Sequence, residues 1–307
     1  MCRLNPNPRT LPFRTNKQEM VCNTGNYDMT DKMKNLLVRT VSGVALAVVI
    51  FGAVLWSPWS LGILLALLIV GGMVEFYALA RRCGAAPQSV IGIVAGLAVL
   101  VAVCFPSGKL FGCALLALFL LVPLSFFCEL WSKSEHPIAD IATTIMGVFY
   151  VAVPFSLLYF FVYSCGAWVS ADGAAGRWAL LGYIVIIWAN DVCAYLVGWA
   201  FGRHPLFPRL SPKKSWEGFI GGIVGAVCVG VFVGHLLDSS CMVWAGLALV
   251  ASVTGVAGDL VESMFKRAAG VKDSGSVIPG HGGVLDRFDA MLLSIPFVLV
   301  YLLFIVL

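Results

Sequence analysis

The chain has 307 residues, of which 60% are hydrophobic and 12% are charged, and its formal net charge is +4. Soluble domains carry about 25% charged residues, so a chain this apolar cannot cover its surface with polar groups in water. The composition therefore excludes a soluble globular protein, and the small positive charge gives no reason to predict nucleic-acid binding.

Apolar runs recur along the chain, and they are long enough to cross about 30 Å of hydrocarbon as helices. The runs do not show the alternating polarity of the strands of a transmembrane barrel. We therefore predict an all-α, polytopic integral membrane protein with about nine transmembrane helices. The spans are expected over residues 40–56, 60–80, 89–106, 110–131, 140–163, 178–201, 216–237, 242–265 and 290–307.

The predicted spans divide the chain into three parts. Residues 1–35 are polar, with Asn, Pro and Thr prominent, and are expected to form a disordered cytoplasmic tail. Residues 36–175 hold the first five spans and few polar motifs. Residues 176–307 hold the last four spans and two polar loops, 202–215 and 266–289. These loops carry most of the candidate catalytic and substrate-binding residues.

The distribution of Lys and Arg predicts the orientation, because cytoplasmic loops carry an excess of both. With the N-terminus placed in the cytoplasm, 18 of the 20 Lys and Arg residues fall in the tail and the inner loops. Only Lys109 and Arg177 fall in the outer loops. Both polar loops are then cytoplasmic.

Several acidic residues fall within the spans, where an unpaired charge costs several kcal/mol. Glu75 and Glu129 lie near helix ends, and a structural role is favoured for both. Glu75 is expected either to extend toward the membrane surface or to pair with Arg81 or Arg82. The span at 178–201 carries Asn190 and Asp191. These two residues either serve an interhelical hydrogen-bond network or line a functional cleft.

The span at 242–265 has one polar helix face, because Asp259, Glu262, Ser263 and Lys266 are spaced i, i+3, i+4 and i+7. Glu262 and Lys266 form either an internal ion pair or part of a polar groove that opens to the cytoplasm. Asp259 lies deepest and has no cation near it in sequence, so a functional role is favoured for it.

The loop KRAAGVKDSGSVIPGHGGVLDRFDA, residues 266–290, combines cations, acids and glycines. Asp286 and Asp289 are three residues apart, and paired carboxylates near phosphates are typical of Mg²⁺ sites. The glycines let backbone N–H groups approach an anion closely. The alternative is that the cations only fix the topology, but topology requires neither glycines nor acids. The loop is therefore predicted to be a metal-phosphate site.

The loop ending in SPKKSWEG is a second candidate anion site. Ser215 is expected to cap the helix that follows, and Lys213 and Lys214 stand just before it, so that a helix N-terminus and two ammonium groups coincide. The glycines at 218, 221, 222 and 225 are expected to serve close helix packing. No Walker sequence is present, which excludes a P-loop protein.

These segments resemble a known family. SMFKRAAGVKDSGSVIPGHGGVLDRFD, residues 263–289, resembles at every fixed position the diagnostic motif of phosphatidate cytidylyltransferases, also called CDP-diacylglycerol synthases. SPKKSWEG and NDVCAYLVGWAFGRH are similar to two further family segments. Ser215 stands where the family usually has Thr, and Trp199 where it has Lys or Arg. The resemblance covers roughly residues 180–290.

The resemblance implies that CTP and phosphatidate react to give CDP-diacylglycerol and pyrophosphate. It implies a homodimer in a membrane, as in the bacterial cytoplasmic membrane, with Mg²⁺ as the cofactor. A second, monovalent cation such as K⁺ is a further option that the resemblance leaves open. Residues 36–175 would then serve lipid access or dimerisation, and residues 176–307 would be catalytic. The implied metal ligands are Asp259, Asp286 and Asp289, with Lys266 and Arg287 as further catalytic residues. The implied substrate-binding residues are Asn190, Asp191, Ser211, Lys213, Lys214, Ser263, Arg267, Lys272, His281, Gly282 and Gly283.

Other functions remain open at this point. A CTP-dependent polyprenol kinase has a similar general layout but releases CDP. A proton-coupled transporter would use Asp191, Asp259 and Glu262 as relays and would need a polar path to both faces. A CDP-alcohol phosphotransferase is disfavoured because its paired motif is missing, and a non-catalytic scaffold because the acids are intact.

Overall fold

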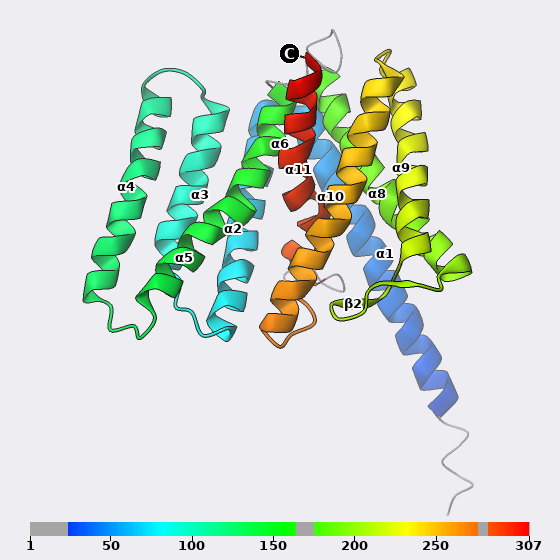
Figure 1. The fold of residues 1–307 in the computed structure, drawn as a ribbon, viewed down its shortest axis with the longest axis horizontal. Coiled ribbons are helices and arrows are strands. Elements are labelled where there is room, and N and C mark those ends of the chain that lie inside the picture. Colours follow the sequence, from blue (N-terminus) through cyan, green and yellow to red (C-terminus); the bar gives the residue numbers. More distant parts are fainter. Residues whose placement is uncertain (1–23, 164–174, 276–281, 307) are drawn as a thin grey trace, which may run out of the picture.

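The computed structural model describes residues 24–163, 175–275 and 282–306, and it is a bundle of helices that run up and down in turn (Figure 1). Within the described residues, seven helices are long and apolar enough to cross a membrane, and shorter apolar helices cover Thr40–Trp56 and Ser89–Cys104. Each of the nine predicted spans corresponds to one of these helical segments. The prediction of an all-α polytopic membrane protein is therefore confirmed.

The helices follow one another along the chain with short connections. They are α1 (Thr24–Trp56), α2 (Pro58–Arg82), α3 (Ser89–Cys104), α4 (Lys109–Trp131), α5 (Pro137–Gly147), the π-helical segment η1 (Val148–Ala152), α6 (Val153–Tyr163), α8 (Ala175–Phe201), α9 (Trp216–Leu236), α10 (Cys241–Ala268) and α11 (Leu285–Val306). The segments α5, η1 and α6 form one continuous span, Pro137–Tyr163.

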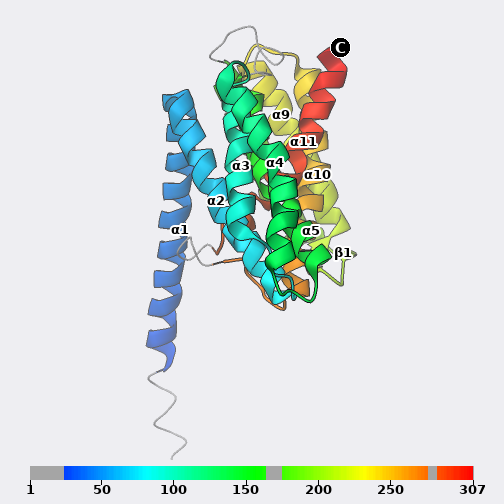
Figure 2. The same ribbon diagram turned by 90° about the vertical axis from the view of Figure 1, so that its left-hand side faces the viewer.

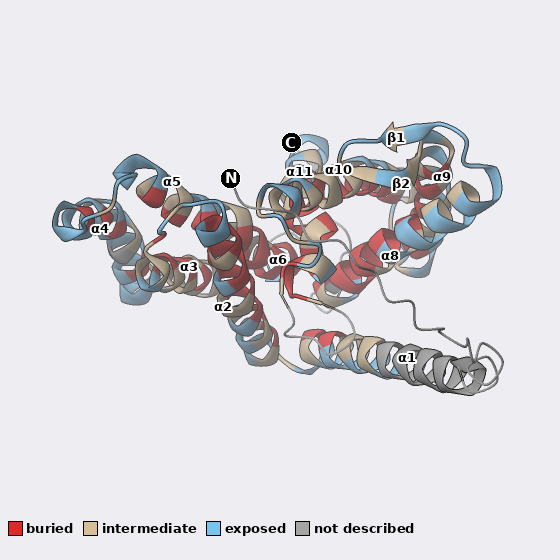
Figure 3. Ribbon diagram, turned by 90° about the horizontal axis from the view of Figure 1, so that it is seen from below, coloured by how far each residue is buried: buried red, intermediate tan, exposed pale blue. Residues whose placement is uncertain are grey.

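Helix α1 corrects the predicted tail, because it begins at Thr24, well before residue 35. Once a helix is nucleated by an apolar segment, each added residue gains a backbone hydrogen bond without a new nucleation cost, so the helix extends into the polar sequence. Residues 1–23 lie outside the described residues. Helix α1 stands beside the rest of the bundle (Figures 2 and 3), and Arg177 of α8 donates a hydrogen bond to the carbonyl oxygen of Leu55 in α1 (2.9 Å).

The up-and-down course of the chain brings the predicted cytoplasmic segments to one end of the bundle, the lower end in Figure 1. The beginning of α1, the α2–α3 connection, the segment between α8 and α9 and the segment between α10 and α11 all lie there. Lys109 and Arg177, at the beginnings of α4 and α8, lie near the other end. The segments that are rich in Lys and Arg in the sequence therefore lie together at one end of the helical bundle.

The segment between α8 and α9 contains a two-stranded antiparallel sheet that we did not predict. Strand β1 (Pro205–Phe207) pairs with β2 (Ser211–Ser215). The strands are joined by a turn in which Leu210 N–H donates to the carbonyl of Phe207 (3.2 Å), with Pro208 at the position where its fixed φ favours a turn. The sheet was missed because its strands are very short and its sequence is rich in Pro and Lys, which are depleted in strands.

Glycines set the spacing of the four C-terminal helices. A Cβ on Gly218 would lie 2.7 Å from the carbonyl oxygen of Ala194, and one on Gly222 would lie 2.8 Å from Oδ1 of Asn190. Helix α9 therefore packs directly on the backbone of α8, which confirms the packing role predicted for these glycines. Ser215 caps α9 as predicted, because its hydroxyl accepts a hydrogen bond from Gly218 N–H (3.1 Å).

Helices α10 and α11 approach each other at Gly258. A Cβ there would lie 2.5 Å from the carbonyl oxygen of Asp289 and 3.1 Å from Cβ of Leu293. The carbonyl oxygen of Asp289 belongs to the backbone of α11, so it cannot move aside as the end of a flexible side chain could. The sequence needs a glycine at this point to bring Asp259, the next residue, close to α11.

Replacing Gly258 by Ala should therefore destabilise the protein. Overpacking a close contact costs about 1–3 kcal/mol, which exceeds the ~1 kcal/mol that alanine gains over glycine inside a helix. Thermal unfolding in detergent micelles would measure the loss. Gly112→Ala in α4 is the matched control, because a Cβ there has no atom of a described residue within 4 Å. This substitution should leave the melting temperature unchanged or raise it. Equal melting temperatures for the two variants would contradict the close-packing argument.

Candidate functional site

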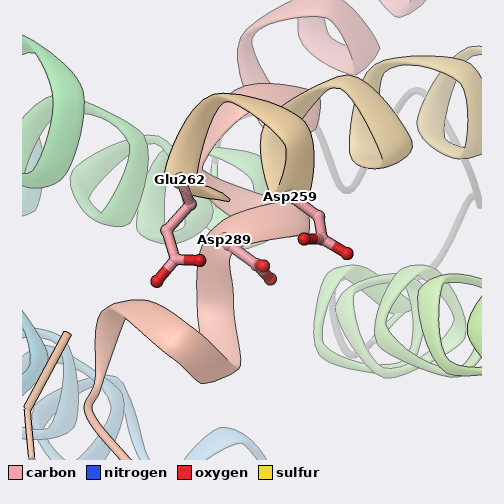
Figure 4. A group of neighbouring side chains, drawn as sticks. All are labelled: Asp259, Glu262 and Asp289. Carbon is pink, nitrogen blue, oxygen red and sulfur yellow. The ribbon is translucent and has the colours of Figure 1, made fainter. Parts of the chain in front are cut away.

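Three carboxylates from two helices meet near the lower end of the bundle. Asp259 and Glu262 of α10 and Asp289 of α11 point toward one another (Figure 4), and one oxygen of each lies within 4.8 Å of the others. We call these three residues the carboxylate triad. The i, i+3 spacing of Asp259 and Glu262 puts both on one helix face, and the close approach at Gly258 brings Asp289 to that face.

Lys266 lies between the triad and the loop that precedes α11. Its ammonium group forms an ion pair with Glu262 and contacts Oδ1 of Asp286 at 2.7 Å. Its side chain is 14% exposed, and that of Glu262 is 1% exposed, so both charges are held away from water. The i, i+4 pair that the sequence suggested is therefore present, and Glu262 also belongs to the triad.

Asp286 lies beside the triad, and its two oxygens already accept four hydrogen bonds. Oδ1 accepts from Lys266, and Oδ2 accepts from the backbone N–H groups of Ser274 (2.9 Å) and Gly283 (2.8 Å) and from the Ser274 hydroxyl (3.0 Å). A carboxylate offers about four lone-pair sites. The assignment of Asp286 as a metal ligand stays a prediction, and these contacts favour a positioning role instead.

Glu75 of α2 reaches the same loop from the N-terminal half of the chain. It is buried, and its carboxylate accepts hydrogen bonds from the N–H groups of Val284 and Leu285 (2.9 Å each) and from the Ser274 hydroxyl (3.1 Å). These N–H groups precede and open α11, where a negative charge also interacts favourably with the helix dipole.

The expected pairing of Glu75 with Arg81 or Arg82 is therefore wrong, since its partners are the loop and the start of α11. The contacts with Glu75 also explain two of the glycines in the loop. A Cβ on Gly275 would lie 2.4 Å from Oε1 of Glu75, and one on Gly283 would lie 2.4 Å from its Oε2. The loop can close over the carboxylate only because these two positions lack side chains.

A cleft of about 370 Å³ extends from Asp259 between α8, α9 and the β-hairpin. Asn190 and Asp191 of α8, Lys213 and Lys214 of β2, and Asp259 all line it, so the structure brings these predicted residues together. Lys214 forms an ion pair with Asp259, which supplies the cation that is missing from the neighbouring sequence. The reading of Asn190 and Asp191 as cleft residues is thereby favoured over a purely structural network.

The remaining predicted site residues are spread around the carboxylate triad and the cleft. Trp199 lines the cleft with 79% of its surface exposed, and the Ser263 hydroxyl donates to Oδ1 of Asp259 (3.3 Å). Arg267, Lys272 and Arg287 are exposed, Ser211 begins β2 and is half-buried, and Gly282 has a positive φ of 85° beside Asp286. His281 lies outside the described residues.

The arrangement combines clustered oxygen ligands with ammonium groups. Carboxylate oxygens are preferred ligands of Mg²⁺, and the two lysines stand on either side of the triad, Lys214 facing the cleft and Lys266 facing the loop. Such a site suits substrates that carry several phosphates. The β-hairpin cleft and the triad share Asp259, so a ligand in the cleft would reach the carboxylates directly.

The sequence model of the cytidylyltransferase family matches residues 37–305 of this chain. The match begins within α1 and ends within α11, so it includes the N-terminal helices that carry Glu75 as well as the loop that Glu75 contacts.

Several curated relatives are named phosphatidate cytidylyltransferase. The proteins of Staphylococcus aureus (strain COL), Staphylococcus haemolyticus and Staphylococcus saprophyticus are 40%, 38% and 36% identical to this chain over 167 residues. Each alignment covers 54% of this chain and 60% of the relative's length.

Replacing Glu75 by Gln should loosen the start of α11. An amide nitrogen cannot accept the N–H groups that the carboxylate accepts, and a hydrogen bond to a charged group contributes about 1.5–3 kcal/mol. Thermal unfolding should show the loss, and hydrogen exchange should speed up at Val284 and Leu285. The exposed Glu135 provides the control, since Glu135→Gln should change stability by less than about 0.5 kcal/mol. Unchanged exchange at the start of α11 would show that Glu75 does not hold it.

Proposed function

Because the chain belongs to the cytidylyltransferase family, we propose that it transfers the cytidylyl group of CTP to phosphatidate, forming CDP-diacylglycerol and pyrophosphate. The observation that carries this proposal is the carboxylate triad with Lys214 and Lys266 beside it, at one end of a membrane bundle and open to a cleft. A lipid substrate requires access from the membrane, and a nucleotide requires a polar cleft at the membrane surface.

The reaction joins two phosphates. An oxygen of the phosphatidate phosphate attacks the α-phosphorus of CTP in line and forms a new P–O bond. The bond from the α-phosphorus to the oxygen that bridges it to the β-phosphorus breaks, and pyrophosphate leaves with that electron pair. Both reactants are anions, so the site must offset their repulsion, and positioning with electrostatic stabilisation accounts for most of the catalysis in such transfers.

We propose that Asp259, Glu262 and Asp289 hold a divalent cation, with Mg²⁺ as the natural candidate. The fit is good, because three oxygen ligands converge from two helices and one of them, Glu262, is almost completely buried. A cation bound there would withdraw charge from the phosphates. Glu262 takes the place that the sequence suggested for Asp286, and Asp286 holds Lys266 and the loop in position.

The lysines have distinct tasks in this proposal. Lys214 lines the cleft, and its ammonium group can replace its ion pair with Asp259 by a contact with a phosphate oxygen of CTP. Lys213, on the same strand, lines the same cleft. Lys266 is fixed between Glu262 and Asp286 and keeps its charge close to the reacting phosphates. Asn190 and Asp191 line the same cleft and would contact the nucleotide.

We propose that this end of the bundle faces the cytoplasm. The loops there hold most of the Lys and Arg residues, which supports a cytoplasmic location, and CTP is a soluble metabolite that reaches the site from that side. A homodimer and a second, monovalent cation remain proposals that rest on the resemblance alone.

Product analysis tests the reaction. Purified protein in mixed micelles with Mg²⁺, phosphatidate and CTP labelled in the cytosine should move label into the chloroform phase as CDP-diacylglycerol. Glu262→Gln should lower turnover at least about 100-fold, because a buried ligand is lost. Glu129→Gln is the control, since Glu129 is also a buried carboxylate but bonds only Gln88 and Ser132 in the described structure. Label that stays in the aqueous phase as CDP, with phosphate gained by a lipid alcohol, would establish a kinase instead.

Metal binding tests the ligand assignment separately from turnover. Titration with Mn²⁺, followed by electron paramagnetic resonance, should show affinity at least about tenfold weaker in Glu262→Gln than in the unsubstituted protein. Asp286→Asn should bind within about threefold of the unsubstituted protein, because the oxygens of Asp286 are already used by Lys266, Ser274 and Gly283. The reverse order of effects would return Asp286 to the ligand set and remove Glu262 from it.

A further inference from the structure

Tyr150 has a buried hydroxyl without a hydrogen-bond partner among the residues that the structure describes. It lies in η1, the π-helical segment in the middle of the span Pro137–Tyr163. Its ring is held by Phe265 of α10, with centroids 5.3 Å apart and ring planes at 86°, and by Phe76 of α2, with centroids 5.6 Å apart. The ring is therefore fixed from two sides while its polar tip is left unpaired.

The three carboxylates of the triad lie close enough to Tyr150 to act electrostatically on its hydroxyl. The ring contact agrees with this position, because Phe265 follows Glu262 by three residues and therefore lies on the same side of α10. Tyr150 thus brings a neutral O–H donor from the N-terminal half of the chain to the side of α10 that carries Glu262.

An unpaired buried hydroxyl lowers the stability of a folded protein. Tyr77 of α2 provides the contrast, because its hydroxyl, in the same part of the bundle, donates to the carbonyl oxygen of Thr144 at 2.8 Å. Single π-helical turns within α-helices are found often at functional sites, where they alter the direction of one side chain. The π-helical turn and the missing partner both point to a ligand as the acceptor for Tyr150.

We propose that the Tyr150 hydroxyl donates a hydrogen bond to a phosphate oxygen of a substrate held at the carboxylate triad. The proposal rests on the function proposed above. Phosphate oxygens are strong acceptors, and a phenol is a donor that adds no charge to a site already flanked by Lys214 and Lys266. Residues 36–175 would then contribute directly to substrate binding, in addition to any role in lipid access or dimerisation.

The test compares Tyr150→Phe with Tyr77→Phe, two substitutions that each remove one hydroxyl and keep the ring. Tyr150→Phe should lower kcat/KM for CDP-diacylglycerol formation about 10- to 100-fold, the effect of one lost hydrogen bond to a charged group, and should leave the melting temperature equal or higher. Tyr77→Phe should lower the melting temperature, because the bond to Thr144 is lost, and should keep kcat/KM within about twofold.

The substrate whose KM rises in Tyr150→Phe, CTP or phosphatidate, identifies the phosphate that accepts the bond. Mn²⁺ affinity should stay unchanged in this variant, and a loss of Mn²⁺ binding would overturn the phosphate contact by making the hydroxyl part of the metal site. A kcat/KM within twofold of the unsubstituted protein, or a melting temperature lowered as in Tyr77→Phe, would overturn it as well. If the unsubstituted protein forms no CDP-diacylglycerol, the proposed function falls together with this contact, whereas an active protein with an equally active Tyr150→Phe variant overturns the contact alone.

Discussion

The hydrogen bonds between Glu75 and the start of α11 hold the two halves of the site together. The N–H groups of Val284 and Leu285 lie 209 and 210 residues from Glu75 in sequence and bond to one buried carboxylate. Without the Glu75 carboxylate, these two N–H groups would be buried at the start of α11 with no acceptor. An unpaired polar group that is shielded from water lowers the stability of the folded protein. The register of α11 follows from this contact, and with it the positions of Asp286 and Asp289.

A continuous set of polar contacts leads from Glu75 to the triad. Ser274 bonds both Glu75 and Asp286, Asp286 bonds Lys266, and Lys266 pairs with Glu262. The five carboxylates of Glu75, Asp259, Glu262, Asp286 and Asp289 have only Lys266 and Lys214 as ion-pair partners among the described residues. Within these described contacts the carboxylates therefore outnumber the ammonium groups, and this imbalance supports the proposed cation site.

Local sequence signals predicted the parts of this molecule that depend on near neighbours. Hydropathy located the spans, because helix length is set by the apolar run itself, and Ser215 was recognised as a cap from the residues that follow it. The partner of Glu75 and the partner of Asp259 could not be predicted, because both lie on other elements of the fold. Asp286 and Glu262 have similar sequence signals for metal binding. Only the contacts of the folded loop separate them.

The membrane environment explains why the N-terminal helices cannot be separated from the site. A polar loop at the end of a bundle is held firmly only where its hydrogen bonds are shielded from water, because a low dielectric strengthens each satisfied bond and penalises each missing one. Helix α2 supplies such a shielded bond through Glu75, and the π-helical turn places the unpaired hydroxyl of Tyr150 in the same region. The same burial that shields the bonds of the loop makes it unfavourable for the Tyr150 hydroxyl to have no acceptor. A substrate phosphate that accepts this hydrogen bond would remove that unfavourable contribution.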